Sequence, residues 1–298
     1  MVELKRIATE QRNPNTMNID TLSTPDMIRL INREDHKVAE AVGLVTDQIA
    51  QAVDLIADRL SKGGRLIYCG AGTSGRLGIL DAVECPPTYS TDPEMVQGLI
   101  AGGYPAIFKA VEGAEDSKEL GVEDMKKISF CHKDVLVGVA ASGRTPYVLG
   151  CMEYARELGA KTVAVTCCPG SVLDSFADIG IAPAPGPEVV TGSTRMKSGT
   201  AQKMVLNMLS TGAMIKLGKV YGNLMVDVKP SNEKLIRRCV TIVCNATQCG
   251  EETAVAALEQ CEYRPKVAII MVLLGVDAEK ARELLANSGG RIAQVLNP

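Results

Sequence analysis

A single apolar stripe near the start of the chain predicts a long amphipathic helix. Apolar side chains recur every three or four residues from Val38 to Leu60, and the pattern ends at Gly63-Gly64. This spacing places them on one face of a helix with 3.6 residues per turn. Just before it, Thr24-Pro25-Asp26 has the form of an N-cap followed by proline at the first helical position, which predicts a short helix near residues 27–31. We expect these N-terminal helices, within residues 1–62, to cover a sheet.

From Arg65 onward the pattern changes to short apolar runs separated by glycine-containing turns and helical stretches. Such alternation is typical of βαβ units, which build a parallel sheet covered by helices on both faces. The predicted strands are Leu66–Cys69, Val96–Ile100, Val135–Ala140, Thr162–Thr166 and Ile179–Ala182. The predicted helices are 76–84, 104–111, 117–127, 145–158, 172–177 and 193–216. The sequence therefore predicts an α/β domain with a doubly wound, five-stranded parallel sheet.

Beyond Gly218 the chain shows helical patterns. The predicted helices are 232–246, 251–261, 265–274 and 278–286, separated by glycine stops. The apolar run Val267–Leu274 would also fit a buried strand, but proline before it and glycine after it favour a helix. We expect N-terminal helices over residues 1–62, an α/β domain over 63–222, and a small helical C-terminal domain over 223–298.

Charge and composition narrow the range of partners. The 298 residues carry a formal net charge of -3, so no basic surplus is present to neutralise a nucleic-acid backbone or an anionic membrane. The first thirty residues contain no apolar run of signal-peptide length, and no segment approaches the length of a membrane span. Ten scattered cysteines without a C-x-x-C pair favour reduced thiols. Two histidines are too few for a histidine-rich metal site. We expect a cytoplasmic protein without a metal centre that binds a small molecule.

The predicted first strand runs into a glycine-rich loop, GAGTSGR at residues 70–76. Glycines let backbone amides approach an anion, and the following helix N-terminus adds unpaired N–H groups. The string also fits G-x-G-x-x-G, the fingerprint of dinucleotide binding, but that fold needs an acidic residue at the end of the second strand. Ile100-Ala101-Gly102-Gly103 stands there instead. A phosphate site with Thr73 and Ser74 as candidate ligands is therefore favoured over a dinucleotide site.

Two further segments have similar chemistry. The predicted third strand ends in a second loop that leads into a helix, and the carboxyl ends of strands are where open α/β sheets bind ligands. The candidate ligands of this loop are Ser142, Gly143, Arg144 and Thr145. A third segment, residues 191–200, places Lys197 at a predicted helix start. Each loop alone is also compatible with an ordinary turn and helix cap, but the three together predict that the protein holds a phosphate.

These features resemble the sugar isomerase (SIS) fold, a five-stranded doubly wound module that binds phosphosugars. Four longer segments extend the resemblance: GAGTSGRLGILDAVECPP at 70–87, VEGAEDS at 111–117, ASGRTPYV at 141–148 and EVVTGSTRMKSGTAQK at 188–203. Through them the chain resembles the N-acetylmuramic acid 6-phosphate etherases, a family related to glucokinase regulatory protein. The resemblance spans nearly the whole chain, and the ECPP and GAED blocks add carboxylates that a generic SIS module does not need.

The resemblance implies a lyase that cleaves the lactyl ether at carbon 3 of the sugar, giving N-acetylglucosamine 6-phosphate and D-lactate during the recycling of cell-wall amino sugars. In the open-chain aldehyde, carbon 3 is β to the carbonyl, so loss of the carbon 2 proton lets lactate leave, and water then adds. This route needs a carboxylate base and a carboxylic acid, but neither a metal nor another cofactor. The resemblance also implies a homodimer.

The two catalytic glutamates of the family correspond to Glu84 and Glu115. Glu84 is predicted at a helix C-terminus, where the negative end of the macrodipole disfavours ionisation, so we expect it to be the proton donor. Glu115 precedes a helix for which Asp116 and Glu119 are the predicted capping pair, a position that favours an ionised base. The alternative is a non-catalytic, sugar-phosphate-sensing regulatory protein of the SIS class, because SIS modules also occur without catalysis.

Overall fold

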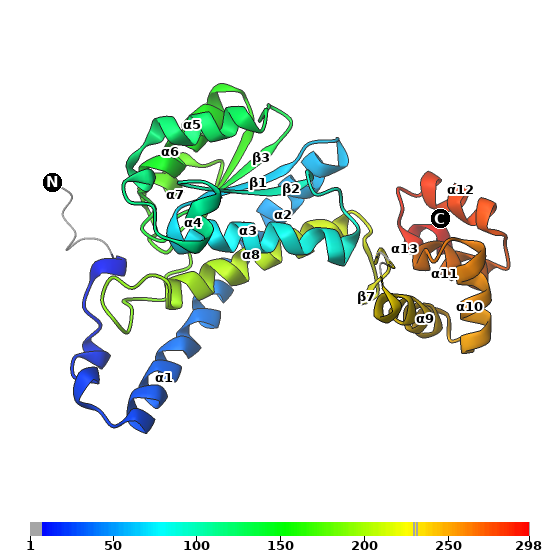
Figure 1. Ribbon diagram of the computed structural model, residues 1–298, viewed down its shortest axis with the longest axis horizontal. Coiled ribbons are helices and arrows are strands. Elements are labelled where there is room, and N and C mark those ends of the chain that lie inside the picture. Colours follow the sequence, from blue (N-terminus) through cyan, green and yellow to red (C-terminus); the bar gives the residue numbers. More distant parts are fainter. Residues whose placement is uncertain (1–7, 229, 231, 298) are drawn as a thin grey trace. The chain divides into compact units, whose positions relative to one another are not determined.

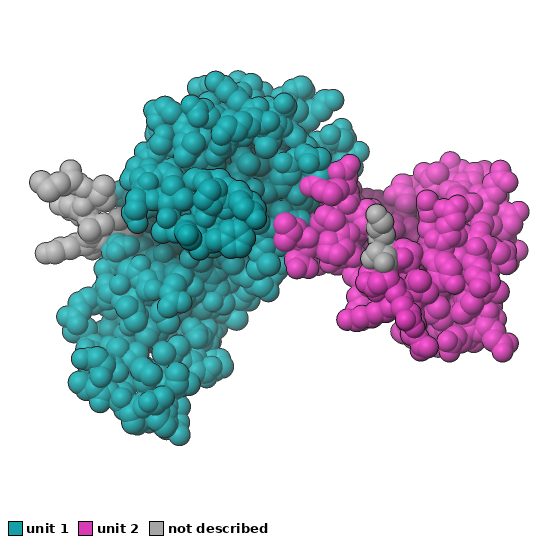
Figure 2. Space-filling view, in the orientation of Figure 1, with its two compact units in different colours: residues 1–82, 94–210 teal, residues 83–93, 211–298 magenta. Residues whose placement is uncertain are grey.

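The computed structural model describes residues 8–228, 230 and 232–297 and divides into two compact units. The first unit contains the described part of residues 1–82 together with 94–210, and the second contains 83–93 together with the described part of 211–298 (Figure 2). The predicted N-terminal helices and most of the predicted α/β domain thus form one unit. The second unit takes up the chain from residue 211, whereas the sequence analysis placed a boundary after residue 222, and it also includes residues 83–93.

The first unit is built on a parallel five-stranded sheet with the order β2-β1-β3-β4-β5 (Figure 1). Its strands are β1 (Leu66–Gly70), β2 (Val96–Ile100), β3 (Val135–Val139), β4 (Lys161–Val165) and β5 (Ile179–Ile181). All residues of β1 and β3 are buried, as expected for strands covered on both faces. The predicted doubly wound α/β class is confirmed, with each strand close to its expected position.

The helices that wholly or partly belong to this unit begin and end differently from several predictions. They are α1 (Thr24–Gly43), α2 (Thr46–Ser61), α3 (Gly72–Tyr89), α4 (Tyr104–Phe108), α5 (Lys118–Lys127), α6 (Pro146–Glu157), α7 (Val172–Phe176) and α8 (Lys197–Lys216). The predicted division into a short helix near residues 27–31 and a longer one from Val38 is wrong, because the break lies after Gly43. The apolar stripe continues across this break, with Val42 and Ile49 both buried, so periodicity did not reveal where the axis turns.

The two faces of the sheet are covered by different helices. On one face, Ile67 of β1 belongs to an apolar cluster with side chains of α5 and α6. On the other face, the Tyr68 hydroxyl donates to Asp81 of α3 at 2.8 Å. Asn207 and Ser210 of α8 donate to the same carboxylate at 2.8 and 3.1 Å. Burial raises the pKa of Asp81, and the three hydrogen bonds oppose that effect. This network fixes the parts of α3 and α8 that carry the glycine loop and its neighbours.

The second unit contains a short hairpin and a helical core. Strands β6 (Val220–Tyr221) and β7 (Leu224–Met225) pair antiparallel, and the helices are α9 (Glu233–Thr247), α10 (Glu251–Gln260), α11 (Pro265–Leu274), α12 (Ala278–Asn287) and α13 (Ile292–Leu296). The four predicted helices are present, and the ambiguous run Val267–Leu274 is helical. None of the helices over the described residues has the length and apolarity that crossing a membrane requires.

Candidate functional site

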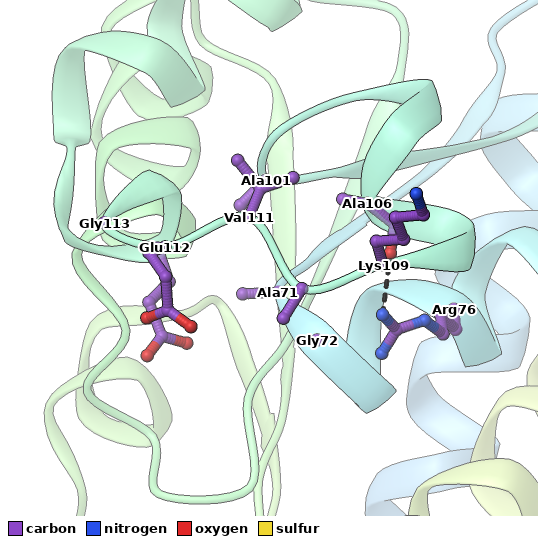
Figure 3. Close-up of a pocket in the computed structure, with 11 residues that line it drawn as sticks. Ala71, Gly72, Arg76, Ala101, Ala106, Lys109, Val111, Glu112 and Gly113 are labelled. Carbon is purple, nitrogen blue, oxygen red and sulfur yellow. Dashed lines mark hydrogen bonds between the residues drawn. The ribbon is translucent and has the colours of Figure 1, made fainter.

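A cavity of about 210 Å³ lies in the first unit, close to the carboxyl ends of β1 and β2. Ala71 and Gly72 line it from the end of β1, Ala101 lines it from the end of β2, and much of the rest comes from the segment between residues 106 and 115 (Figure 3). Chain order along the sheet reverses between β1 and β3. Open α/β sheets bind ligands outside the carboxyl ends of their strands near such a reversal. The cavity lies at this edge of the sheet, beside β1 and β2.

The glycine loop is shorter than predicted, because α3 begins at Gly72 rather than at Arg76. A Cβ on Gly70 would lie 2.7 Å from the Gly75 nitrogen, so glycine here lets the helix start directly against the strand. Ser74 therefore lies in the first turn of α3, where it is buried, and its hydroxyl donates to Gln202 of α8 at 2.9 Å. Thr73, beside it, is half-buried. Gln202 orients one of the predicted phosphate ligands, a role that the sequence pattern of α8 did not indicate.

The second predicted loop follows β3 and forms a compact turn before α6. Gly143 has φ of +66°, and a Cβ there would collide with the Ser171 hydroxyl oxygen. Ser142 is half-buried and Arg144 is exposed. Thr145 is the N-cap residue of α6, but its side chain makes no capping hydrogen bond. The structure thus brings the four predicted residues together in one loop, separate from the residues lining the cavity near Glu115, and their contact with a phosphate stays a prediction.

Lys197 lies in a buried ion pair instead of facing a cavity as a free cation. Its side chain is 1% exposed, and its Nζ donates to Glu34 at 2.8 Å and to the Pro185 carbonyl at 3.0 Å. Burial alone would raise the pKa of Glu34, but hydrogen bonds from Lys197, Lys37 and two asparagines outweigh it and lower the pKa to about 2. In this structure the charge of Lys197 is therefore neutralised within the protein.

The start of α8 is also occupied by the protein itself. The Glu188 carboxylate is fully buried and accepts hydrogen bonds from the backbone N–H groups of Lys197 and Ser198, each at 2.9 Å. A carboxylate at this position satisfies the first N–H groups of the helix and interacts favourably with its dipole. The helix start that was predicted to bind an anion is thus occupied by the Glu188 carboxylate. The sequence alone did not show whether a side chain of the protein or a bound ligand would occupy it.

Glu115 lines the cavity, as does a second carboxylate that the sequence analysis did not select, Glu112. Glu115 belongs to the 3-10 turn Ala114–Asp116, and its side chain is exposed. The capping residue of α5 is Ser117, whose hydroxyl oxygen accepts from the Leu120 N–H at 3.1 Å, so the predicted Asp116 cap is wrong. The expectation that Glu115 lies just before the N-terminus of α5 is confirmed.

Glu84 belongs to the second unit, and its helical context differs from the prediction. Helix α3 continues through Pro86 and Pro87 to Tyr89, and the Ser90 N–H still bonds to the Pro86 carbonyl at 3.0 Å. The two prolines have no N–H group to donate, but this hydrogen bond still closes the turn that contains them. Glu84 is exposed and stands more than one turn before the helix end. Because the macrodipole acts mainly within the last turn, the dipole argument for Glu84 as the acid does not apply.

Two cations complete the lining of the cavity. Arg76 of α3 donates from Nε to the Ile107 carbonyl and from Nη2 to the Ala106 carbonyl, each at 2.8 Å. Lys109 follows α4, and its side chain is exposed. Neither residue was selected from the sequence, although Arg76 ends the glycine loop. The cavity therefore combines carboxylates with positive charge, which suits proton transfer on an anionic ligand.

Comparison with known proteins agrees with this architecture. The family model described as the glucokinase regulatory protein N-terminal SIS domain matches residues 48–156, and the SIS domain model matches residues 123–212. Among solved structures, a putative phosphosugar isomerase involved in capsule formation from Bacteroides fragilis is 22% identical, with a TM-score of 0.50 over 66% of this chain and 94% of that one. That similarity supports the SIS fold.

Relatives similar along the whole chain are more informative. The N-acetylmuramic acid 6-phosphate etherase of Aliivibrio fischeri is 57% identical over 296 residues, which cover 99% of both chains. Proteins of this name from Klebsiella aerogenes and Vibrio cholerae, the latter numbered 1, are 56% and 58% identical over the same share. These alignments span both compact units of the chain. The chain belongs to the N-acetylmuramic acid 6-phosphate etherase family.

Proposed function

We propose that this protein is a lyase that cleaves the D-lactyl ether of N-acetylmuramic acid 6-phosphate, giving N-acetylglucosamine 6-phosphate and D-lactate. The observation that carries the proposal is the identity of 56–58% along 99% of the chain with proteins named for this activity. The cavity at the carboxyl edge of the sheet also supports the proposal, because Glu115 lines it and can serve as the base of the reaction.

The reaction is an elimination followed by an addition. In the open-chain sugar, a carboxylate removes the proton at carbon 2, and the electron pair moves toward the carbonyl. The C3–O bond then breaks, the departing lactate oxygen takes a proton from a carboxylic acid, and a C2=C3 double bond forms. Water adds across this bond, with its hydroxyl on carbon 3 and a proton returned to carbon 2. Proton transfers of this kind contribute about 10²–10⁴-fold each.

We assign the base to Glu115 and the acid to Glu84. Glu115 is exposed, lines the cavity and stands just before the N-terminus of α5, where its carboxylate can reach a bound sugar. The role of Glu84 rests on its match to the family motif, since its position in α3 gives no separate argument. Ser142 and Thr145 are the proposed phosphate ligands because their loop precedes α6, whose N-terminal N–H groups can bind an anion.

Lactate release from N-acetylmuramic acid 6-phosphate tests the activity, and isotope exchange tests the roles. Glu84→Gln should release no lactate but should still exchange the carbon 2 proton in deuterated water, because the enolate forms and is reprotonated. Glu115→Gln should lose both. Glu112→Gln is the matched control, since it removes the neighbouring cavity carboxylate, and it should keep both. Exchange that persists in Glu115→Gln and disappears in Glu84→Gln would reverse the assignment.

Family membership also indicates where, and in which oligomeric state, the protein would act. We expect the protein to act in the cytoplasm as a homodimer during recycling of cell-wall amino sugars, without a metal or redox cofactor. The match of residues 48–156 to the regulatory-protein SIS domain is the feature that a non-catalytic sensor would share. A sensor would bind the phosphosugar without releasing lactate, so the same assay separates the two functions.

A further inference from the structure

The proposed function leaves one end of the cavity beside Glu115 without a role. In the view of Figure 3, Glu112 lies on one side of Ala71 and Gly72, whereas Arg76 and Lys109 lie on the other. The cavity thus has an acidic end and a cationic end. Within the cavity, Glu115 alone is assigned to proton transfer, and the cationic end requires a separate explanation.

The charge of Arg76 is held in place but not neutralised. Its side chain is half-buried, and two backbone carbonyl oxygens, those of Ala106 and Ile107, accept its hydrogen bonds. Carbonyl oxygens orient a guanidinium without cancelling its positive charge, and no described carboxylate forms an ion pair with Arg76. A guanidinium has five N–H donors in a fixed plane, so donors remain for an incoming anion. A partly desolvated and uncompensated cation is costly unless such an anion arrives.

Lys109 adds a second, adjustable charge at the same end. It is the C-cap residue of α4, where its backbone N–H bonds to the Pro105 carbonyl at 3.0 Å and fixes the start of the side chain. Its side chain is exposed and has no ion-pair partner in the described part of the chain. The four-carbon stem lets the ammonium follow a ligand. An arginine fixed by the backbone and a mobile lysine together make a site for an anionic group.

The substrate of the proposed function has two anionic groups, a phosphate and the lactyl carboxylate. The loop of Ser142 and Thr145, our proposed phosphate site, follows β3 and does not line this cavity. We propose that Arg76 and Lys109 bind the lactyl carboxylate, and so make the cavity selective for the lactyl ether over the same sugar phosphate without it. This inference rests on the proposed function. Arginine suits the role because its planar donors match both oxygens of a carboxylate.

The test compares two ligands that differ only in the lactyl group. Calorimetry would measure the Kd of N-acetylmuramic acid 6-phosphate and of N-acetylglucosamine 6-phosphate on Glu115→Gln protein, which should not turn over. Lys109→Met in this background should weaken the muramic ligand about 10- to 100-fold, as expected for loss of a charged hydrogen bond, and leave the other unchanged. Lys109→Arg should restore most of the affinity. Arg76→Lys, which retains the charge but loses the planar donors, should weaken the muramic ligand selectively.

The matched control is Lys133→Met, which removes another exposed lysine, just before β3 and so at the amino ends of the strands. It should change neither Kd. Equal weakening of both ligands by Lys109→Met would mean that the cationic end binds the phosphate, and no weakening of either would mean that it binds no ligand. Both results overturn the proposal. If the unaltered protein releases no lactate, the proposed function fails, yet selective weakening would still establish a carboxylate site.

Discussion

Replacing Lys197 with methionine should destabilise the protein without altering the phosphosugar site directly. Lys197 and Glu34 are 1% and 3% exposed, and their charged atoms lie 2.8 Å apart. Removing one partner of a buried pair costs about 3–5 kcal/mol, because the other charge is left without compensation. Asn13, Asn15 and Lys37 still donate to Glu34 after the change. We therefore expect the lower end of this range, about 3 kcal/mol.

Urea unfolding followed by far-UV circular dichroism would measure the loss, with the midpoint and slope fitted for the transition that includes the first unit. Lys37→Met is the matched control, because Lys37 donates to the same carboxylate at 2.6 Å but its side chain is 46% exposed. A partly exposed pair of this kind contributes less than about 1 kcal/mol. Glu34→Gln combined with Lys197→Met removes the stranded carboxylate and should recover part of the stability.

The same variants separate a structural role of Lys197 from the predicted role as a substrate ligand. If the buried pair only supports the fold, folded Lys197→Met protein should keep a KM for the phosphosugar close to that of the unaltered protein. Unfolding identical to the unaltered protein, combined with a strongly raised KM, would refute the reasoning and return Lys197 to the substrate site.

Four further outcomes are expected. Because the pKa of Glu34 falls from its usual 4.5 to about 2, its stabilising contribution is complete above about pH 4.5 and is lost as the pH falls toward about 2. The urea midpoint of the unaltered protein should therefore drop more steeply in this pH window than that of Glu34→Gln. Gly143→Ala, which combines a positive φ with a clash, should abolish phosphosugar binding, whereas Gly159→Ala, with a positive φ and open space, should cost only about 1–2 kcal/mol of stability. Changing Ser142 and Thr145 together to alanine should raise the KM for the 6-phosphate and remove the preference over the unphosphorylated sugar. A chelator should leave lactate release unchanged, and activity restored by one divalent ion would contradict the carboxylate mechanism.

Local pattern was sufficient for the sheet and for the position of Glu115 along the chain. Short apolar runs such as Val135–Val139 are strands because burial on both faces requires continuous apolar residues, and that requirement is visible in sequence. The position of Glu115 just before a helix was likewise predicted, although the cap of that helix is Ser117 and not the predicted Asp116. The proposed roles of Glu84 and Glu115 came from the family motifs. These features depend on residues close together in the chain.

Contacts between distant segments decided the rest. Lys197 and Glu34 are 163 residues apart, and only the folded chain shows that the predicted ligand cation is neutralised by an internal acid. Arg76 and Lys109 reach one cavity because α3 and the segment after α4 follow neighbouring strands, an adjacency set by sheet order. Sequence determined which side chains could hold a charge or move a proton. Tertiary structure decided which charges are already paired and which remain for a ligand, because pairing depends on distance in space and on burial.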